Sequence, residues 1–184
     1  MKLAETIKSN INLDKIPSEM KKYNQWVCWK SKQRDNEKIS KIPINPINGR
    51  YAKPNDPTTW GSFEEAKACY RSNGFEGVGF VFSEQDDFIG IDLDDCIDAE
   101  SGQVDSYANE IIEKIKSYTE ISPSGRGVHI IVKGKWPGGG RKNDKIEIYD
   151  EERFFTITGH LLNGSNKMVE IRDDELKWLY HFVF

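Results

Sequence analysis

The sequence contains few cysteines and no long apolar segment. Its 184 residues include 3 cysteines, too few and too scattered for the paired C-x-x-C motifs of a zinc site, and their odd number argues against a disulfide framework. No run of about 18 apolar residues occurs that could cross a membrane, and the N-terminal segment lacks the apolar core of a secretory signal. We therefore expect a protein of a reducing compartment, the cytoplasm, with no membrane partner.

The sequence also lacks an excess of positive charge. It has 26 Lys and Arg against 30 Asp and Glu, so the formal net charge is −4. This balance excludes a uniformly basic surface, and binding to nucleic acid would need a local basic patch instead. Candidates for such a patch are Lys41, Arg141 and Lys142.

A composition of 37% hydrophobic and 30% charged residues is typical of a globular protein, and a chain of this length can bury a sizeable core. Helix starts are indicated at Ser62, which Glu65 follows as in a capping box, and at Asp105. A further helix is expected near the end of the sequence, at 173–184. Strands are predicted from apolar and β-branched runs, at 26–29, 77–82, 88–93, 128–132, 146–149 and 154–157. The predicted class is α+β with an antiparallel or mixed sheet, in which 77–82 and 88–93 pair as a hairpin.

The stretch 88–96 places charge where a strand should be apolar. Strict alternation puts Asp92 and Asp94 on one face and their apolar neighbours on the other. Two carboxylates about 7 Å apart along a strand repel each other unless a cation lies between them, and a hard divalent ion is the natural guest. A solvated turn after a buried strand is the alternative interpretation. Asp95 is offset to the opposite face, and we expect its side chain to act as a cap or to pair with a basic residue elsewhere.

A glycine-rich turn leads into another β-branched run at 122–132. Glycines on both sides of Arg126 let the backbone approach a ligand and turn its N–H groups outward, as in an anion-binding nest. Ser124 and His129 add a hydroxyl and an imidazole to the same place.

A third segment, 145–150, again interrupts a β pattern with an acid, Glu147, between two isoleucines. Asp150 is the rival acid, but its neighbours are those of a turn. Three strand-borne carboxylates together with a phosphate-cradling turn indicate metal-assisted phosphoryl chemistry.

In order, the three motifs resemble those of the archaeo-eukaryotic primase superfamily, and they are most similar to the primase-polymerase domains of phages and plasmids. The motifs are hydrophobic-Asp-hydrophobic-Asp at 91–94, Ser-Gly-x-Gly-x-His at 124–129 and hydrophobic-acid-hydrophobic at 146–148. The resemblance implies an RRM-like catalytic sheet with flanking helices at about 77–184, joined to a small N-terminal α/β unit at about 1–76. It also implies that 1–184 is one catalytic domain, the N-terminal part of a longer replication protein.

The activity that the resemblance implies is that of a DNA primase and polymerase, a template-dependent nucleotidyltransferase. Two Mg²⁺ or Mn²⁺ ions would be held by the catalytic residues Asp92, Asp94 and Glu147, with Asp94 as the bridging ligand. The deoxynucleoside or ribonucleoside triphosphate would be bound by Ser124, Gly125, Arg126, Gly127, His129 and Arg153. Arg153 could equally pair with Glu151. The implied partners are a single-stranded DNA template, a primer and a helicase, for a monomeric domain in a bacterial or phage-infected cell.

Two other functions are compatible with the sequence. A metal-dependent nuclease or phosphoesterase would use the same acids without a nucleoside triphosphate. A non-catalytic module would bind single-stranded DNA at a replication origin, with Trp26, Trp29 and Trp136 as stacking platforms. Product growth that depends on a triphosphate distinguishes the polymerase from both.

Overall fold

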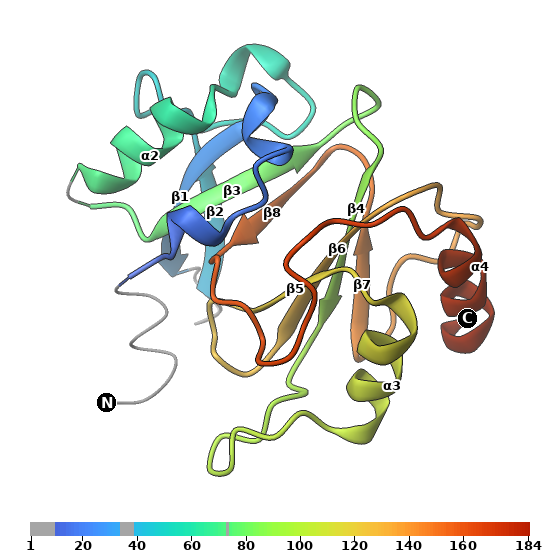
Figure 1. Ribbon diagram of the computed structural model, residues 1–184. Helices are drawn as coiled ribbons and strands as arrows, with labels where there is room; N and C mark the ends of the chain where they lie inside the picture. Colours follow the sequence, from blue (N-terminus) through green and yellow to red (C-terminus); the bar gives the residue numbers. More distant parts are fainter. Residues whose placement is uncertain (1–9, 34–38, 73) are drawn as a thin grey trace.

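The computed structural model describes residues 10–33, 39–72 and 74–184, which form two four-stranded antiparallel sheets and three α-helices (Figure 1). The strand order of the first sheet is β2 (Ile39–Ile44), β1 (Trp26–Gln33), β3 (Gly77–Phe82) and β8 (Arg153–Ile157). The strand order of the second is β5 (Tyr118–Ile121), β6 (Val128–Lys133), β4 (Phe88–Leu93) and β7 (Ile146–Tyr149). The helices are α2 (Phe63–Arg71), α3 (Ser106–Ile115) and α4 (Asp173–Val183), with short 3-10 turns η1 (Leu13–Lys15), η2 (Met20–Lys22) and η3 (Pro57–Thr59). The predicted α+β class is confirmed. Among these residues no helix is both long and apolar enough to cross a membrane.

Two helices, α3 and α4, cover one face of the second sheet (Figure 1). Alternation along β4 directs Ile89, Ile91 and Leu93 to this face, where they are buried in one cluster with side chains of α3 and α4. Burial of a side chain of this size contributes about 1.5–3 kcal/mol, so this face anchors the sheet. The other residues of β4 face the first sheet, where Phe88 packs edge-on against Phe80. A four-stranded antiparallel sheet with helices on one face agrees with the predicted RRM-like sheet.

Helix α2 packs on the first sheet and begins at the predicted capping box. The Ser62 hydroxyl accepts a hydrogen bond from the Glu65 backbone N–H at 3.3 Å, and the Glu65 carboxylate accepts one from the Ser62 N–H at 2.8 Å. These two bonds satisfy N–H groups that a helix start otherwise leaves without partners.

The predicted lobe boundary near residue 76 does not follow the sheets. β3 and β8, which were assigned to the catalytic lobe, pair with each other in the first sheet, and β3 also pairs with β1. The N-terminal sheet is therefore completed by a strand from the far end of the chain. Sequence order could not reveal this, because β8 comes more than 70 residues after β3 begins.

The predicted hairpin of 77–82 with 88–93 is wrong. β3 already has β1 and β8 as its two neighbours, and all six of its residues are buried. β4 instead enters the second sheet. Asp86 shapes the connection, since its carboxylate accepts hydrogen bonds from the backbone N–H groups of Ser83 (3.0 Å) and Phe88 (2.9 Å) and from the Gln25 side chain (2.6 Å).

The chain after β8 returns along the outer edge of β5. The Ile121 N–H donates to the His160 carbonyl at 2.8 Å, and the Leu162 N–H donates to the Thr119 carbonyl at 3.1 Å. This covers an edge strand that would otherwise present unpaired backbone groups. It also brings residues 158 and 159 against the end of β5.

Candidate active site

Four ionisable side chains form a row across one face of the second sheet. The register pairs Asp92 of β4 with Glu147 of β7 on one side and with His129 of β6 on the other, and His129 in turn with Glu120 of β5. Directly opposed residues in antiparallel strands have Cβ atoms about 4.5–5.5 Å apart. The strand pairing therefore brings together the three motifs that the sequence placed in separate segments.

A cavity of about 560 Å³ lies beside this row, between the two sheets. Its residues come from both sheets: Ile39, Lys41, Pro54, Asp92, His129, Tyr149, Arg153, Phe154, Phe155 and Thr156. One acid and an imidazole thus lie on the side of the second sheet, and two basic residues, Lys41 and Arg153, come from strands of the first. An anionic ligand that carries a cation would find complementary charge here.

Asp94 lies one residue beyond β4, at the rim of the sheet. Its backbone N–H donates to the Lys145 carbonyl at 3.0 Å, which fixes it beside β7. Partial burial of the carboxyl raises the pKa of Asp94 above its ordinary value, and the negative charges of Asp92 and Glu147 raise it further. Asp94 therefore lies close enough to Asp92 and Glu147 for their negative charges to act on it.

Glu147 is held by cationic neighbours. Its carboxylate contacts the Lys142 ammonium, accepts a hydrogen bond from the Tyr149 hydroxyl at 2.9 Å and lies 3.4 Å from the Arg153 guanidinium. Burial acts to raise the pKa of Glu147, but the hydrogen bonds from Lys142 and Tyr149 and the nearby positive charges outweigh it and lower the pKa. Arg153 therefore pairs with Glu147 rather than with Glu151, and its guanidinium lies over the Tyr149 ring at 4.8 Å.

The glycine-rich turn is packed against the end of β4. The Ser124 hydroxyl lies 2.9 Å from that of Ser122, and Gly125 has φ +71°, a conformation that favours glycine. A Cβ at Gly127 would lie 2.7 Å from the Leu93 carbonyl oxygen, so only glycine permits this approach. The turn therefore lies against the end of β4. The predicted outward-facing nest is not formed, because the N–H groups of Gly125, Arg126 and Gly127 donate to the Ser122 carbonyl, the Ser124 hydroxyl and the Ser122 hydroxyl.

Arg126 points away from the row. Its guanidinium lies 3.1 Å from the Asp95 carboxylate, and both side chains are largely exposed. The pair lines a separate cleft of about 580 Å³ with other acids, including Asp98 and Asp105. The expected pairing of Asp95 with a basic residue is confirmed. Arg126, which was predicted to bind the nucleotide, does not line the cavity of Asp92 and His129.

The three predicted DNA-contacting cations have different surroundings. Lys41 lines the cavity, where its ammonium lies 3.4 Å from the Thr156 hydroxyl. Arg141 instead donates to both carboxylate oxygens of Asp150, at 2.9 and 2.6 Å, and Lys142 contacts Glu147. Arg141 and Lys142 thus fold the glycine-rich loop before β7 back onto the strand, and Asp150 is engaged by Arg141 rather than by the carboxylate cluster.

Two of the tryptophans proposed as stacking platforms are unavailable to bases. Trp26 and Trp29 are 0% and 2% exposed. Trp136 packs edge-on against Tyr180 and Phe184 of the C-terminal segment. The aromatic residues of the strand 26–29 are core residues, which counts against the origin-binding alternative.

The sequence reasoning missed Glu120. Its side chain is completely buried, and it lies beside His129 with a carboxylate oxygen 3.2 Å from Nδ1. The signal was present, since Glu120 is an acid inside a β pattern like Glu147, but its flanking Thr119 made the segment look like an ordinary polar edge.

The donor set fits a hard divalent cation in its chemistry. Within residues 10–33, 39–72 and 74–184, no three Asp, Glu, His or Cys side chains are already gathered as they would be around a metal ion. Carboxylate oxygens are nonetheless the ligands that Mg²⁺ prefers, and a cation would offset the negative charge that Asp92 and Glu147 place on Asp94. Glu147 would have to exchange its contact with Lys142 for the metal.

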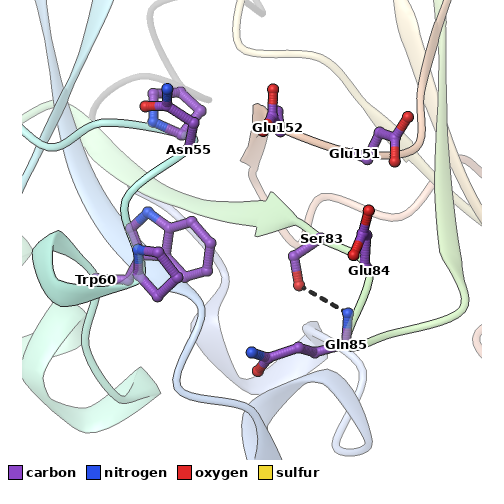
Figure 2. Close-up of a pocket in the computed structure, with 9 residues that line it drawn as sticks. Asn55, Trp60, Ser83, Glu84, Gln85, Glu151 and Glu152 are labelled. Carbon is purple, nitrogen blue, oxygen red and sulfur yellow. Dashed lines mark hydrogen bonds between the residues drawn. The ribbon is translucent and has the colours of Figure 1, made fainter.

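A smaller cavity of about 200 Å³ lies next to the site and has the opposite character. Figure 2 shows Trp60 and Asn55 on one side, with Glu84 and Glu151 on the other. The lining residues include a third acid, Glu152, and no basic residue. Pro54 lines both cavities, so this acidic pocket borders the candidate active site but does not suit a phosphate.

The motifs that form this site resemble those of primase-polymerase domains. Comparison with curated proteins bears this out: the chain is 40% identical over 158 residues to a protein named DNA Primase-polymerase, from Nitratiruptor phage NrS-1. The match covers 83% of this chain but 21% of the phage protein, so the chain spans about a fifth of the length of that relative. No protein-family model matches the chain.

Proposed function

We propose that the chain is the catalytic domain of a DNA primase-polymerase, which joins nucleotides to a primer 3′-hydroxyl on a single-stranded DNA template. The observation that carries this proposal is the row of Glu147, Asp92 and His129 beside one cavity. The cavity volume of about 560 Å³ lies within the range of about 300–1,000 Å³ that is usual for small-ligand sites. The similarity to a phage protein of that name supports the same activity.

Asp92, Asp94 and Glu147 are the residues that would hold Mg²⁺ or Mn²⁺, which would activate the 3′-hydroxyl and neutralise the triphosphate. The raised pKa of Asp94 reflects clustered negative charge that a cation would offset. Tyr149 donates a hydrogen bond to Glu147 at 2.9 Å and so restricts the orientation of its carboxylate. These residues would position the metal ions and the reacting groups and stabilise their charge. Phosphoryl transfer requires little covalent chemistry from the protein beyond this.

The triphosphate would lie along β6 and the turn before it. His129 directs its Nε2 atom toward Asp92, 3.6 Å away, and would contact a phosphate oxygen beside the acid cluster. The turn before β6 would add the Ser124 hydroxyl, because the N–H groups of Gly125, Arg126 and Gly127 already donate to oxygens of the turn itself. Arg153 and Lys41, on the opposite wall, would neutralise the remaining charge. Preorganised donors of this kind stabilise charge that develops in the transition state.

Primer extension tests the proposal. A labelled primer on a single-stranded template is incubated with Mg²⁺ or Mn²⁺ and either deoxynucleotides or ribonucleotides, using wild type and Asp94→Asn. We expect extension that requires template, metal and Asp94. Asp174→Asn is the matched control, because Asp174 is an exposed acid of α4 whose carboxylate pairs with Lys177 at 2.9 Å.

The alternatives have distinct outcomes in the same assay. Shortening of the primer or template without triphosphate would indicate a nuclease and contradict the proposal. Extension that is equal in wild type and Asp94→Asn would mean that the carboxylate cluster is not the site. Neither reaction, in protein that still binds single-stranded DNA, would favour a binding module.

A further inference from the structure

The carboxylate of Glu120 is among the most deeply enclosed charged groups that the structure describes. Both of its oxygens accept hydrogen bonds: Oε2 from the Tyr118 hydroxyl at 2.7 Å and the Gly159 N–H at 2.8 Å, and Oε1 from the Thr158 N–H at 2.9 Å. The residue has no exposed surface. Because burial of a charged group is costly, a carboxylate is retained at such a position only with partners of this kind.

The fourth partner is the imidazole of His129, whose Nδ1 atom lies 3.2 Å from Oε1. The Thr158 N–H can only donate, so Oε1 is an acceptor, and the Nδ1 atom is then the donor. A hydrogen bond at one ring nitrogen decides which nitrogen carries the proton and how the ring is oriented. With Nδ1–H directed at Glu120, Nε2 faces the cavity, and it donates to an ionised phosphate oxygen when the ring carries a proton on both nitrogens.

The ring of His129 is held on its other side as well. It packs on Phe155 with a centroid distance of 4.3 Å, and its side chain is 1% exposed. Rotation of the ring by a half-turn would place carbon atoms opposite Glu120 and Asp92. Nε2, 3.6 Å from Asp92, is thus the polar atom of this ring that a ligand in the cavity can reach.

We propose that Glu120 is a positioning residue: it fixes the His129 ring so that Nε2 is presented to the phosphates of the nucleotide. This rests on the proposed function, in which His129 contacts the triphosphate. Glu120 itself does not touch the ligand. Residues 158 and 159, which follow β8, hold Glu120 in place, so the segment that covers the β5 edge also supports the site.

The first measurement concerns the free protein and needs no ligand. Nitrogen-15 NMR of the imidazole should show a proton on Nδ1 of His129 that exchanges slowly with water. This signal should disappear in Glu120→Ala and persist in Ser117→Ala. Ser117 is a matched control, since it is equally buried and its hydroxyl bonds the Ile131 carbonyl at 2.6 Å, outside the Glu120 contacts. A wild-type ring with its proton on Nε2 alone would overturn the proposal.

The second measurement is binding of dATP with Mn²⁺ by calorimetry, without DNA. We expect the dissociation constant to rise at least tenfold in Glu120→Ala and to change less than twofold in Ser117→Ala. In a His129→Ala background, Glu120→Ala should add less than a further twofold, because its effect passes through the ring. Equal losses in both backgrounds would assign Glu120 a general structural role and refute the proposal.

The conservative variant covers the case in which Glu120→Ala does not fold. Glu120→Gln keeps one acceptor oxygen but must turn its amide toward one pair of donors, so it should bind dATP at least threefold more weakly than wild type. Binding within twofold would count against the proposal. If wild type binds no triphosphate, the proposed function fails, and the Nδ1 signal still decides whether Glu120 holds the ring.

Discussion

Lys142 contacts the Glu147 carboxylate, which a metal ion at this site would need as a ligand. Replacing Lys142 should therefore make metal binding tighter. Its ammonium contacts Glu147, which is also held by Tyr149 and by Arg153. A metal ion that binds Glu147 must displace this ammonium, so its binding free energy is reduced by the free energy of the Lys142–Glu147 contact. Lys142→Met removes the competing charge and keeps a side chain of similar length.

The size of the effect follows from the exposure of the pair. The Lys142 side chain is 68% exposed and that of Glu147 is 15% exposed, so solvent screens the attraction. Pairs with an exposed partner contribute roughly 0.2–1 kcal/mol, which corresponds to a change of about 1.4- to 5-fold in a binding constant. We therefore expect the dissociation constant for Mn²⁺ to fall by a factor in this range.

Metal binding is measured by the paramagnetic resonance of free Mn²⁺, without nucleotide or DNA, so that any role of Lys142 in DNA binding does not enter. Lys177→Met is the control, since it removes the same charge from a pair with Asp174 on α4. Lys142→Met that binds Mn²⁺ no more tightly than Lys177→Met would refute the idea that Lys142 competes for the metal site.

Three further predictions concern the fold. Gly127→Ala should destabilise the protein by about 1–3 kcal/mol in urea unfolding, because the added Cβ would lie 2.7 Å from the Leu93 carbonyl oxygen; Gly139→Ala, with nothing within 4 Å of the new Cβ, should be nearly neutral. Ser62→Ala should cost about 1 kcal/mol through loss of the helix cap. The hydrogen bonds from Ser62 lower the pKa of Glu65 below its ordinary value of 4.5. Their contribution to stability should therefore be complete above pH 4.5 and lost as the pH falls through the lower pKa of the folded state. Glu65→Gln should not lose stability in this pH range. Burial raises the pKa of all three cysteine thiols, to about 12 for Cys96, so alkylation at pH 8 should be slow in native protein and rapid in urea.

Local patterns predicted the elements that local chemistry determines. The cap at Ser62 and the start of α3 at Asp105 follow from side chains that satisfy nearby backbone N–H groups. Alternation along β4 correctly placed Asp92 apart from its apolar neighbours, and the apolar flanks of Glu147 correctly identified β7 as a strand. In each case the information lies within a few residues of the feature.

Pairing between distant strands could not be predicted in the same way. The expected hairpin assumed that β3 and β4 pair because they are consecutive, which is the commonest arrangement. The partners of β3 are instead β1 and β8, on either side of it in the sheet. The partners of Glu120 show the same limit: the N–H groups that make its burial tolerable belong to Thr158 and Gly159, 38 and 39 residues away.

The distribution of charge limits how a nucleic acid could reach the site. On one side of the cavity, across Pro54, lies the pocket lined by Glu84, Glu151 and Glu152, which would repel a phosphate backbone. On the other side Lys41 and Arg153 line the cavity, and Lys142 would join them if a metal ion displaced it from Glu147. Lys41 and Arg153 are the only Lys or Arg residues among the described residues that line these two cavities. In a chain with net charge −4, we expect DNA binding to depend on the occupied site, because a bound metal ion and triphosphate would change both the charge of the cavity and the partner of Lys142.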